Sequence, residues 1–263
     1  MTAASLEPRR SIPWESFDAG PLPSEARSVV GDTWRERMKQ EHLAVGAFAL
    51  LAQELAEDGC DPVVLSLVTR AANDEVRHTE VCRRMAVALL GEAEVPARLH
   101  GVPKVPQHPQ SSREERVLLH VVEMCCLSET ITGVYFTEML GRATQPTARA
   151  ALESLLEDEI DHGRVGWAYL STRARDARLD GLAAALPALL ERTVGRALRV
   201  ADRSHEDDAA MESYGWLGRT TAMTTIRRAL REVIVPGFET LGVDLSVARS
   251  AIDKLLSGSP LRP

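Results

Sequence analysis

The chain of 263 residues has few aromatic side chains and no large excess of charge of either sign. Aromatic residues make up 4% of the sequence, whereas alanine, leucine, arginine and glutamate are abundant, a composition that favours helix. The 31 Lys and Arg residues are outnumbered by 38 Asp and Glu residues, which gives a formal net charge of −7. This balance argues against a nucleic-acid partner, because phosphates require a clustered basic surface.

Cysteine is also scarce, and no CxxC pair is present. The four cysteines therefore suggest neither a zinc ribbon nor a thioredoxin-like site, and they are typical of reduced thiols in a cytosolic protein: Cys60, Cys82, Cys125 and Cys126. The N-terminal sequence lacks the continuous apolar stretch of a signal peptide. No run is expected to provide the roughly 20 apolar residues that span a bilayer. We expect a soluble, cytoplasmic protein without a membrane partner.

The chain is predicted to be all-α, because apolar residues recur at helical spacing and no strand alternation is present. Residues 1–25 contain four prolines and are expected to form an irregular arm. A four-helix bundle is expected over residues 26–176, with helices at 26–57, 63–90, 113–141 and 147–176. The proline-rich segment 91–112 is long enough to cross the full length of the bundle between the second and third helices.

Additional helices are expected in the C-terminal segment, residues 177–263. Helical patterns occur there at 181–204, 208–235 and 245–256. We expect these helices to pack on the bundle as part of the same domain.

Each of the four bundle helices carries an apolar stripe that is interrupted by one glutamate near its middle. In the second and fourth helices a histidine follows three residues later, on the same face. The stripe of the second helix reads Val68, Ala71, Glu75, His78, Cys82, Met85 and Leu89. A solvated face would not have such apolar neighbours. The six polar stripe residues are candidate metal ligands: Glu41, Glu75, His78, Glu129, Glu159 and His162.

Four glutamates that meet in a bundle core require positive charge. A lone buried carboxylate costs several kcal/mol, and four together repel one another. Two divalent cations would balance the four carboxylates while both imidazoles stay neutral. An oxygen-rich set with one imidazole per ion suits iron or manganese better than zinc.

This pattern resembles the ligand scheme of the ferritin-like di-iron and di-manganese carboxylate superfamily, in which two helices each give a glutamate and two others each give a Glu-x-x-His motif. The resemblance covers roughly residues 30–172. It implies that Glu75 and Glu159 bridge two metal ions. The terminal ligands would be Glu41 with His78 and Glu129 with His162, and which histidine serves which ion stays open.

Two aspartates directly precede the Glu-x-x-His glutamates. In related di-iron proteins such residues accept the N–H of a metal-bound histidine on the facing helix. Asp74 and Asp158 are candidates for this role, and exposed charges are the alternative. The stretch NDEVRH also resembles the DExRH motif of di-iron oxygenases. Arg77 is expected either to pair with Asp158 or to face solvent.

Small residues near the expected centre have two interpretations. Thr132, Gly133 and Gly166 could leave room for O2 and substrate, with Thr132 as a candidate catalytic residue, or they could permit close helix packing. Tyr169 is expected to line the pocket. Histidines outside the stripes are interpreted as ordinary surface or core side chains: His42, His100, His108, His120 and His205. Glutamates outside the stripes are interpreted as solvated, with Glu36 as the one competitor of Glu41 for the ligand position: Glu36, Glu54, Glu123 and Glu138. A basic stripe on a later helix is expected to be solvated or to dock an acidic partner: Arg192, Arg196, Arg199 and Arg203.

The resemblance implies a non-haem di-iron oxygenase or oxidase that activates O2 to hydroxylate or N-oxygenate a small organic substrate. The two ions would be iron, with manganese or a mixed pair as alternatives. No GxGxxG fingerprint is present, so an external donor such as a ferredoxin or reductase would supply electrons. A ferroxidase or other iron-handling protein, a manganese catalase-like protein and a structural dimetal module remain alternatives. The roughly 90 residues after the fourth helix favour the enzyme, because a storage ferritin needs little more than the bundle. A homodimer is left open.

Overall fold

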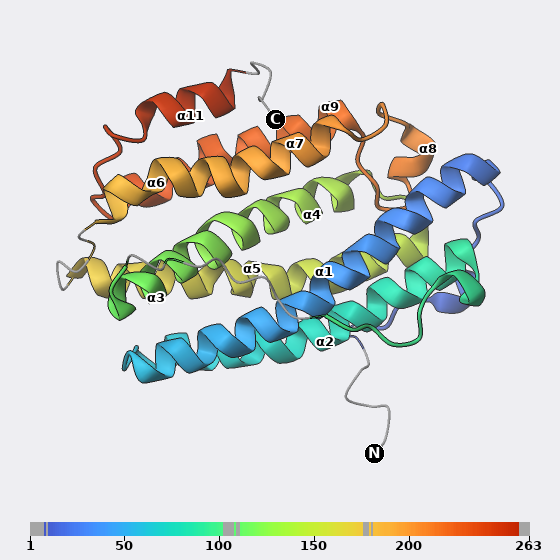
Figure 1. Cartoon of the computed structure of the whole chain (residues 1–263). Helices are drawn as coiled ribbons and strands as arrows, with labels where there is room; N and C mark the ends of the chain where they lie inside the picture. The colour runs from blue at the N-terminus through green and yellow to red at the C-terminus, as the bar shows by residue number, and fades with distance from the viewer. Residues whose placement is uncertain are drawn as a thin grey trace.

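The computed structural model describes residues 8, 10–101, 108, 111–175, 179 and 181–257. Every regular element in these ranges is a helix, and none of the described residues lies in a strand (Figure 1). The all-α prediction is therefore confirmed. The prediction for residues 1–25 lies partly outside the described ranges. Between Arg10 and Pro23 the chain is irregular except for a 3-10 turn at Trp14–Ser16.

The first two helices form a long hairpin. Helix α1 (Ser24–Glu57) packs along helix α2 (Pro62–Leu90), and both lie within two residues of the predicted ranges. Helix α2 begins where Asp61 accepts a hydrogen bond from the Val63 backbone N–H and Pro62 occupies the first turn. It ends at Gly91, whose φ of 92° is rarely adopted by other residues.

The third long helical segment is continuous but composite. It consists of α3 (Arg113–Val121), the π-helical segment η4 (Val122–Glu129) and α4 (Thr130–Arg142). Its position agrees with the predicted helix at 113–141, but the π-helical geometry was not predicted. Helical segments with this wider hydrogen-bonding pattern occur frequently at functional sites. Glu129, one of the candidate ligands, is the last residue of η4.

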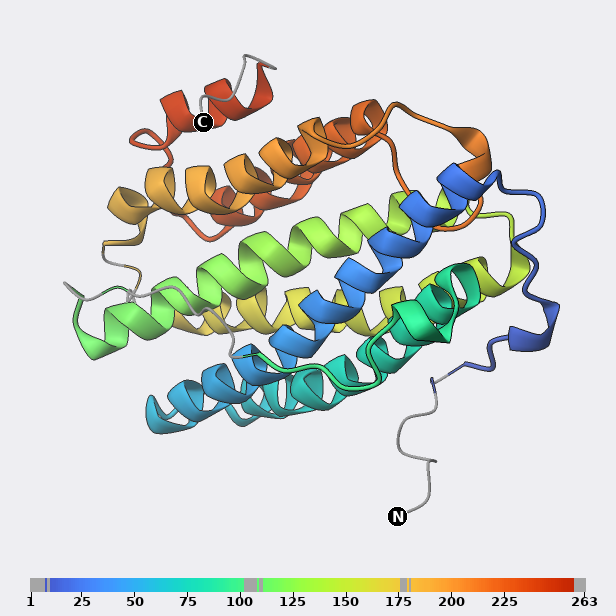
Figure 2. The ribbon, with the colours of Figure 1, turned by 45° about the vertical axis from the view of Figure 1, so that its right-hand side comes forward.

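The fourth segment, α5 (Pro146–Arg175), follows a short turn and packs against α2, η4 and α4. The four long segments lie side by side (Figures 1 and 2). The end of α2 and the start of α3 lie at opposite ends of this group, as the predicted long crossover requires. Residues 102–107 and 109–110 of that crossover lie outside the described residues.

The C-terminal segment adds shorter helices over α4 (Figure 1). They are α6 (Leu182–Leu190), η5 (Glu191–Gly195), α7 (Arg196–Asp202), α8 (Ala209–Glu212), α9 (Arg219–Ala229), η6 (Leu230–Ile234), α10 (Val235–Thr240) and α11 (Arg249–Leu256). Helix α9 packs against α4 and α7. The single helix predicted at 208–235 was wrong, because the chain turns between α8 and α9, where Gly215 has a φ of 79°.

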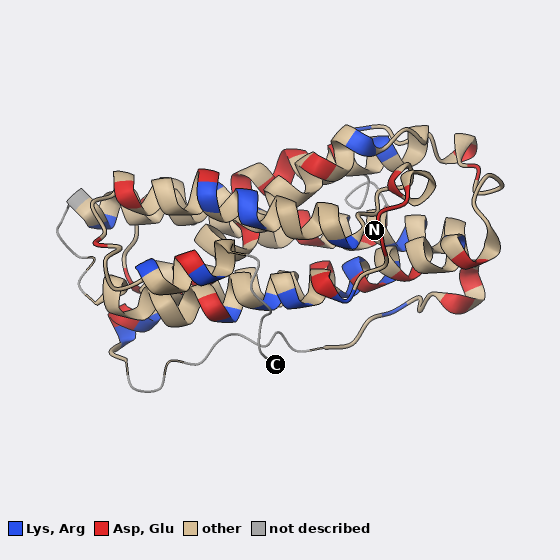
Figure 3. Ribbon diagram, turned by 90° about the horizontal axis from the view of Figure 1, so that it is seen from above, with Lys and Arg blue, Asp and Glu red and all other residues tan. Residues whose placement is uncertain are grey.

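The third segment is more apolar than the sequence analysis allowed. By length and composition alone, the helical segment Arg113–Arg142 is long and apolar enough to cross a membrane. The expectation that no run of the chain is long enough was therefore wrong. However, 67% of its most apolar window is buried, as in the core helix of a soluble protein. Charged residues of both signs alternate along the outer helices (Figure 3). Burial between the bundle and the C-terminal helices explains the apolar composition of this segment.

Candidate metal centre

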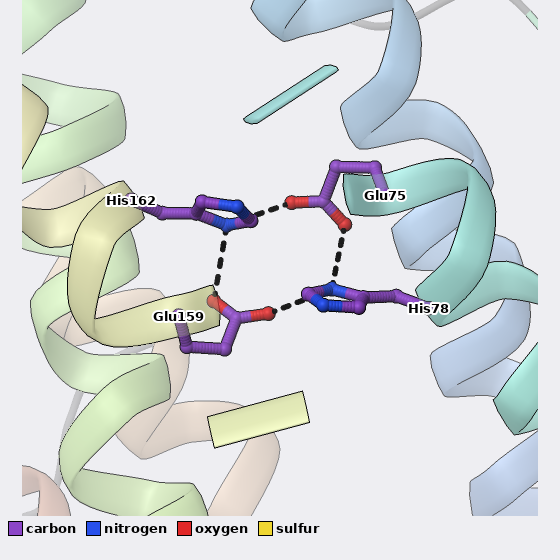
Figure 4. A group of neighbouring side chains, drawn as sticks. All are labelled: Glu75, His78, Glu159 and His162. Atoms are coloured by element: carbon purple, nitrogen blue, oxygen red, sulfur yellow. Dashed lines mark ion pairs between the residues drawn. The ribbon is translucent and has the colours of Figure 1, made fainter. Parts of the chain in front are cut away.

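Helices α2 and α5 bring four of the six candidate ligands into one buried group (Figure 4). Glu75, His78, Glu159 and His162 are each at most 2% exposed, and one ligand atom from each lies within 4.8 Å of all the others. Each imidazole Nδ1 faces both carboxylates. The distances are 3.3 Å from His78 Nδ1 to Glu75 Oε2, 3.2 Å from His78 Nδ1 to Glu159 Oε1, 3.1 Å from His162 Nδ1 to Glu75 Oε1 and 3.6 Å from His162 Nδ1 to Glu159 Oε2.

The symmetry of this group follows from the repeated motif. A spacing of three residues places the glutamate and the histidine of each motif on one face of its helix. Because α2 and α5 pack against each other, each glutamate reaches the histidine of its own helix and that of the facing helix. The centre is thus built from two equivalent halves.

The polar atoms in this group lack hydrogen-bond partners. Within the part of the chain that the structure describes, Nδ1 of both histidines, Oε2 of Glu75 and both carboxylate oxygens of Glu159 face the centre, are buried and form no hydrogen bond, and His162 Nε2 on the side of Asp74 also forms none. Leaving such atoms unsatisfied costs free energy, whereas a cation among them would use all of them as ligands. These residues therefore fit a metal ion. Two carboxylates and two imidazoles can hold several transition metals.

The other two candidate ligands stand farther from the centre. Glu41 is 7% exposed, and its Oε2 lies 4.0 Å from His78 Nδ1. Glu129 is half-buried at the end of η4. Burial raises the pKa of both carboxyl groups well above the usual value, and the negative charges of Glu75 and Glu159 raise it further. Glu41 and Glu129 therefore feel the negative charges of Glu75 and Glu159, although they are not among the four residues that lie closest together.

The histidines supply the positive charge in the absence of metal. Burial opposes ionisation of Glu75 and Glu159, but His162 and His78 outweigh it and lower the pKa of both carboxyl groups. Burial likewise opposes protonation of the two imidazoles. Contacts with Asp158 for His78 and with Asp74 for His162, followed by Glu159 and Glu75, nevertheless raise the pKa of both histidines well above the usual value. A bound cation would replace these protons.

The two aspartates contact the far side of each imidazole. His78 Nε2 lies 3.3 Å from Asp158 Oδ2, and His162 Nε2 lies 3.5 Å from Asp74 Oδ2, so each aspartate serves the histidine of the facing helix. Arg77 Nη2 lies 3.1 Å from Asp158 Oδ2 and also contacts Asp74. Both aspartates are at most 2% exposed, so the alternative of exposed charges was wrong. Of the two positions considered for Arg77, the structure shows the pairing with Asp158.

Six carboxylates and two arginines determine the net charge around the centre. Arg77 lies between the two aspartates, and Arg70 Nε lies 3.7 Å from Asp74 Oδ2. Arg70 also contacts Asp161, whose charge Arg164 offsets, so this pair adds nothing to the sum. With neutral histidines, two guanidinium groups leave four negative charges uncompensated. This is the charge of two divalent cations, and buried charges are tolerated when they are matched in this way.

The small residues have different surroundings. A Cβ atom at Gly166 would lie 2.6 Å from Cys126 Sγ and 2.9 Å from the Cys126 backbone nitrogen, so this glycine permits close packing of α5 on η4. Its interpretation as room for substrate was wrong. A Cβ at Gly133 would meet nothing within 4 Å. Thr132 is half-buried in α4, three residues beyond Glu129.

On the α1 side, the buried ring of Phe48 lies 5.0 Å from the His162 ring.

Tyr169 does not line the centre. Its hydroxyl donates to Asp58 Oδ2 over 3.2 Å and accepts from Arg173 Nε over 2.9 Å, which ties α5 to the end of α1. That Tyr169 lines a substrate pocket stays a prediction. Burial is the largest cause that raises the pKa of this phenol.

Several residues interpreted as solvated form buried or partly buried ion pairs. Glu123 is 8% exposed and binds Arg192, so neither residue is simply solvated. Glu54 Oε2 lies 2.8 Å from His120 Nδ1, and Glu138 contacts Arg142 and Arg228. The basic stripe is interrupted in the same way, since Arg199 pairs with Glu191. Spacing along one helix gave no signal for these contacts, because most of the partners lie on other helices.

No family model matches the sequence, and no curated protein or solved structure is significantly similar to it. The geometry of the centre is therefore the basis on which a function is proposed.

Proposed function

We propose that the protein is a ferritin-like non-haem di-iron oxidoreductase that uses O2 to hydroxylate or N-oxygenate a small organic substrate. The observation that carries this proposal is the pair of Glu-x-x-His motifs on facing helices, with unpartnered carboxylate oxygens and imidazole nitrogens turned to a common point. The donors are oxygen and nitrogen atoms, and no cysteine belongs to the group. Such a set suits iron or manganese better than a structural zinc ion.

Each residue of the centre has a distinct task in this proposal. Glu75 and Glu159 each face both halves of the centre and would bridge two ions. Glu41 with His78, and Glu129 with His162, would complete the terminal ligands. The hydrogen bond between His78 Nε2 and Asp158 would keep the proton on Nε2 and leave the Nδ1 lone pair for the metal, and Asp74 faces His162 Nε2 at 3.5 Å in the same way.

The chain also determines how the site is enclosed and supplied. Iron, when bound, would supply the redox chemistry that reduces O2. Manganese or a mixed pair of ions is the alternative. Phe48 and the helices around the centre exclude water from the carboxylates. Electrons would come from an external ferredoxin or reductase, unless the substrate provides them.

Iron handling is the second candidate function, and a purely structural dimetal module is the third. The C-terminal helices favour the enzyme, because α9 covers α4 and adds a layer that a minimal ferroxidase bundle does not need. A structural site would normally be closed by its protein ligands. The three candidates therefore differ in what happens when iron and O2 are added.

The test is to load the protein anaerobically with Fe(II), mix it with O2, and follow both O2 consumption and iron oxidation. We expect about two Fe(II) bound per chain, as in other two-metal sites, and O2 consumption that continues only while a reduced ferredoxin is supplied. Oxidation of many Fe(II) per chain with retained mineral would contradict the proposal in favour of iron handling. Bound metal without any O2 consumption would contradict it in favour of a structural module.

A matched pair of variants controls this test. Glu159→Gln removes a charge from the centre, whereas Glu157→Gln changes an exposed neighbour on the same helix that pairs with Arg10. We expect the first variant to lose iron-dependent O2 consumption and the second to retain it.

A further inference from the structure

Arg37 on α1 is a partly buried arginine whose guanidinium contacts only uncharged groups among the described residues. Its Cζ atom lies 4.3 Å from the ring centroid of Trp34 and 5.2 Å from that of Phe136. Its Nη2 lies 3.1 Å from Met139 Sδ and 3.5 Å from the carbonyl oxygen of Gly215. Helices α1 and α4 thus hold its side chain between two aromatic rings.

The second terminal nitrogen of this side chain has no partner. Arg37 Nη1 is buried and forms no hydrogen bond with any residue that the structure describes. Among those residues, no carboxylate lies within ion-pair distance of Arg37, in contrast to Arg77 and Arg173, which each contact two. A buried N–H of a charged group without an acceptor is costly, so a site of this kind calls for an anion or another acceptor.

Arg37 lies one helical turn before Glu41 on α1. It precedes Glu41 by four residues on α1, which is about 6 Å along the helix axis. Its charge also reaches the inward side chains of the neighbouring helices. Burial raises the pKa of Cys82 on α2 and of Tyr135 on α4, and the positive charge of Arg37 counteracts both shifts. Arg37 therefore faces the space between α1, α2 and α4.

A simple counter-ion for Glu41 would look different. No contact within 4.0 Å joins the Arg37 guanidinium to Glu41 or to any other described carboxylate. Two aromatic rings lie within 5.2 Å of the guanidinium carbon and Nη2 is already engaged, so Nη1 is the terminal nitrogen that is left for a further acceptor. A planar fork of donors matches the two oxygens of a carboxylate.

We propose that Arg37 binds the carboxylate of the substrate, which makes the substrate a small organic acid. The remainder of the molecule would extend about one helical turn towards Glu41 and the centre. This inference rests on the proposed function, because only an enzyme has a substrate. Anion binding at Arg37 can nevertheless be measured without turnover. A failure of anion binding would leave the O2 test above unaffected.

The test is calorimetric titration of the full-length protein with benzoate, both with divalent metal bound and metal-free. The metal-free arm separates binding at Arg37 from direct binding to a metal ion. We expect benzoate to bind in both forms and Arg37→Met to weaken the affinity at least about tenfold, since a charge-assisted pair contributes more than 1.4 kcal/mol. Arg37→Lys keeps the charge without the fork and should bind with intermediate affinity, and it replaces the methionine variant if that variant does not fold.

Three comparisons complete this test. Arg35→Met is the matched control, because Arg35 lies on the same helix, pairs with Asp32 and should not affect benzoate binding. Benzamide has the shape of benzoate without its charge and should not bind. The inference is overturned if benzoate does not bind, if Arg37→Met binds it as tightly as the wild type, if benzamide binds equally well, or if inorganic phosphate binds more tightly than benzoate.

Discussion

The position of one proton on each site histidine decides whether its ring can serve a metal. His78 and His162 turn Nε2 towards an aspartate of the facing helix and Nδ1 towards the carboxylates. A carboxylate accepts a hydrogen bond from Nε2–H. The proton of the neutral ring therefore stays on Nε2, and the lone pair is on Nδ1. The crossed arrangement makes each half of the centre depend on both helices.

Replacing Asp158 with asparagine tests this dependence. The amide can present its N–H₂ group to His78 Nε2, which favours the tautomer with the proton on Nδ1 and removes a ligand. We expect Asp158→Asn to weaken binding of Co(II), an optically visible divalent ion, by about 10–100-fold in a chelator competition. Glu157→Gln, an exposed neighbour, should bind as the wild type does. Equal affinities of Asp158→Asn and wild type would contradict the role given to the aspartates.

At the scale of the helices, much of the fold follows from periodicity. The bounds of α1, α2 and α5 lie within two residues of the predicted ranges, because long apolar stripes end at proline and glycine. The π-helical segment η4 was missed because Val122–Glu129 contains no glycine or proline to mark it. The turn between α8 and α9 was missed although Gly215 and Gly218 were visible in the sequence.

The centre was more predictable from sequence than its surroundings. Glu75, His78, Glu159 and His162 interrupt apolar stripes at a repeated spacing, so sequence alone identified the residues that the structure brings together. Arg37 gave no such signal, because a single arginine on a helix usually faces solvent. Its aromatic and backbone contacts come partly from residues about 100 or more positions away in the chain, such as Phe136 and Gly215.

Close packing of α5 on η4 can be tested with two glycines that differ in their surroundings. Gly166→Ala places a methyl group against Cys126, so overpacking should lower the free energy of unfolding by about 1–3 kcal/mol. Gly133→Ala places the same group in open space within a helix and should raise it by up to about 1 kcal/mol. Urea denaturation with a common slope measures both changes. A Gly166→Ala variant that is as stable as the wild type would contradict the packing described here.

At the scale of the whole molecule, the fold encloses a cluster of carboxylates whose charge, once both histidines are neutral, the neighbouring arginines offset only in part. The carboxylates of α1, α2, η4 and α5 converge, two arginines offset part of their charge, and the remainder equals the charge of two divalent ions. The C-terminal helices cover the third segment and complete the burial. A metal pair would thus connect the two helical hairpins at their centre.

The most direct test of this claim is an anomalous diffraction map at the iron absorption edge, from crystals of the Fe(II)-loaded protein. We expect two peaks about 3.5–4 Å apart, both within bonding distance of Glu75 and Glu159 and each beside one histidine. A map with no peak among these four residues, or with iron bound only elsewhere on the protein, would contradict it.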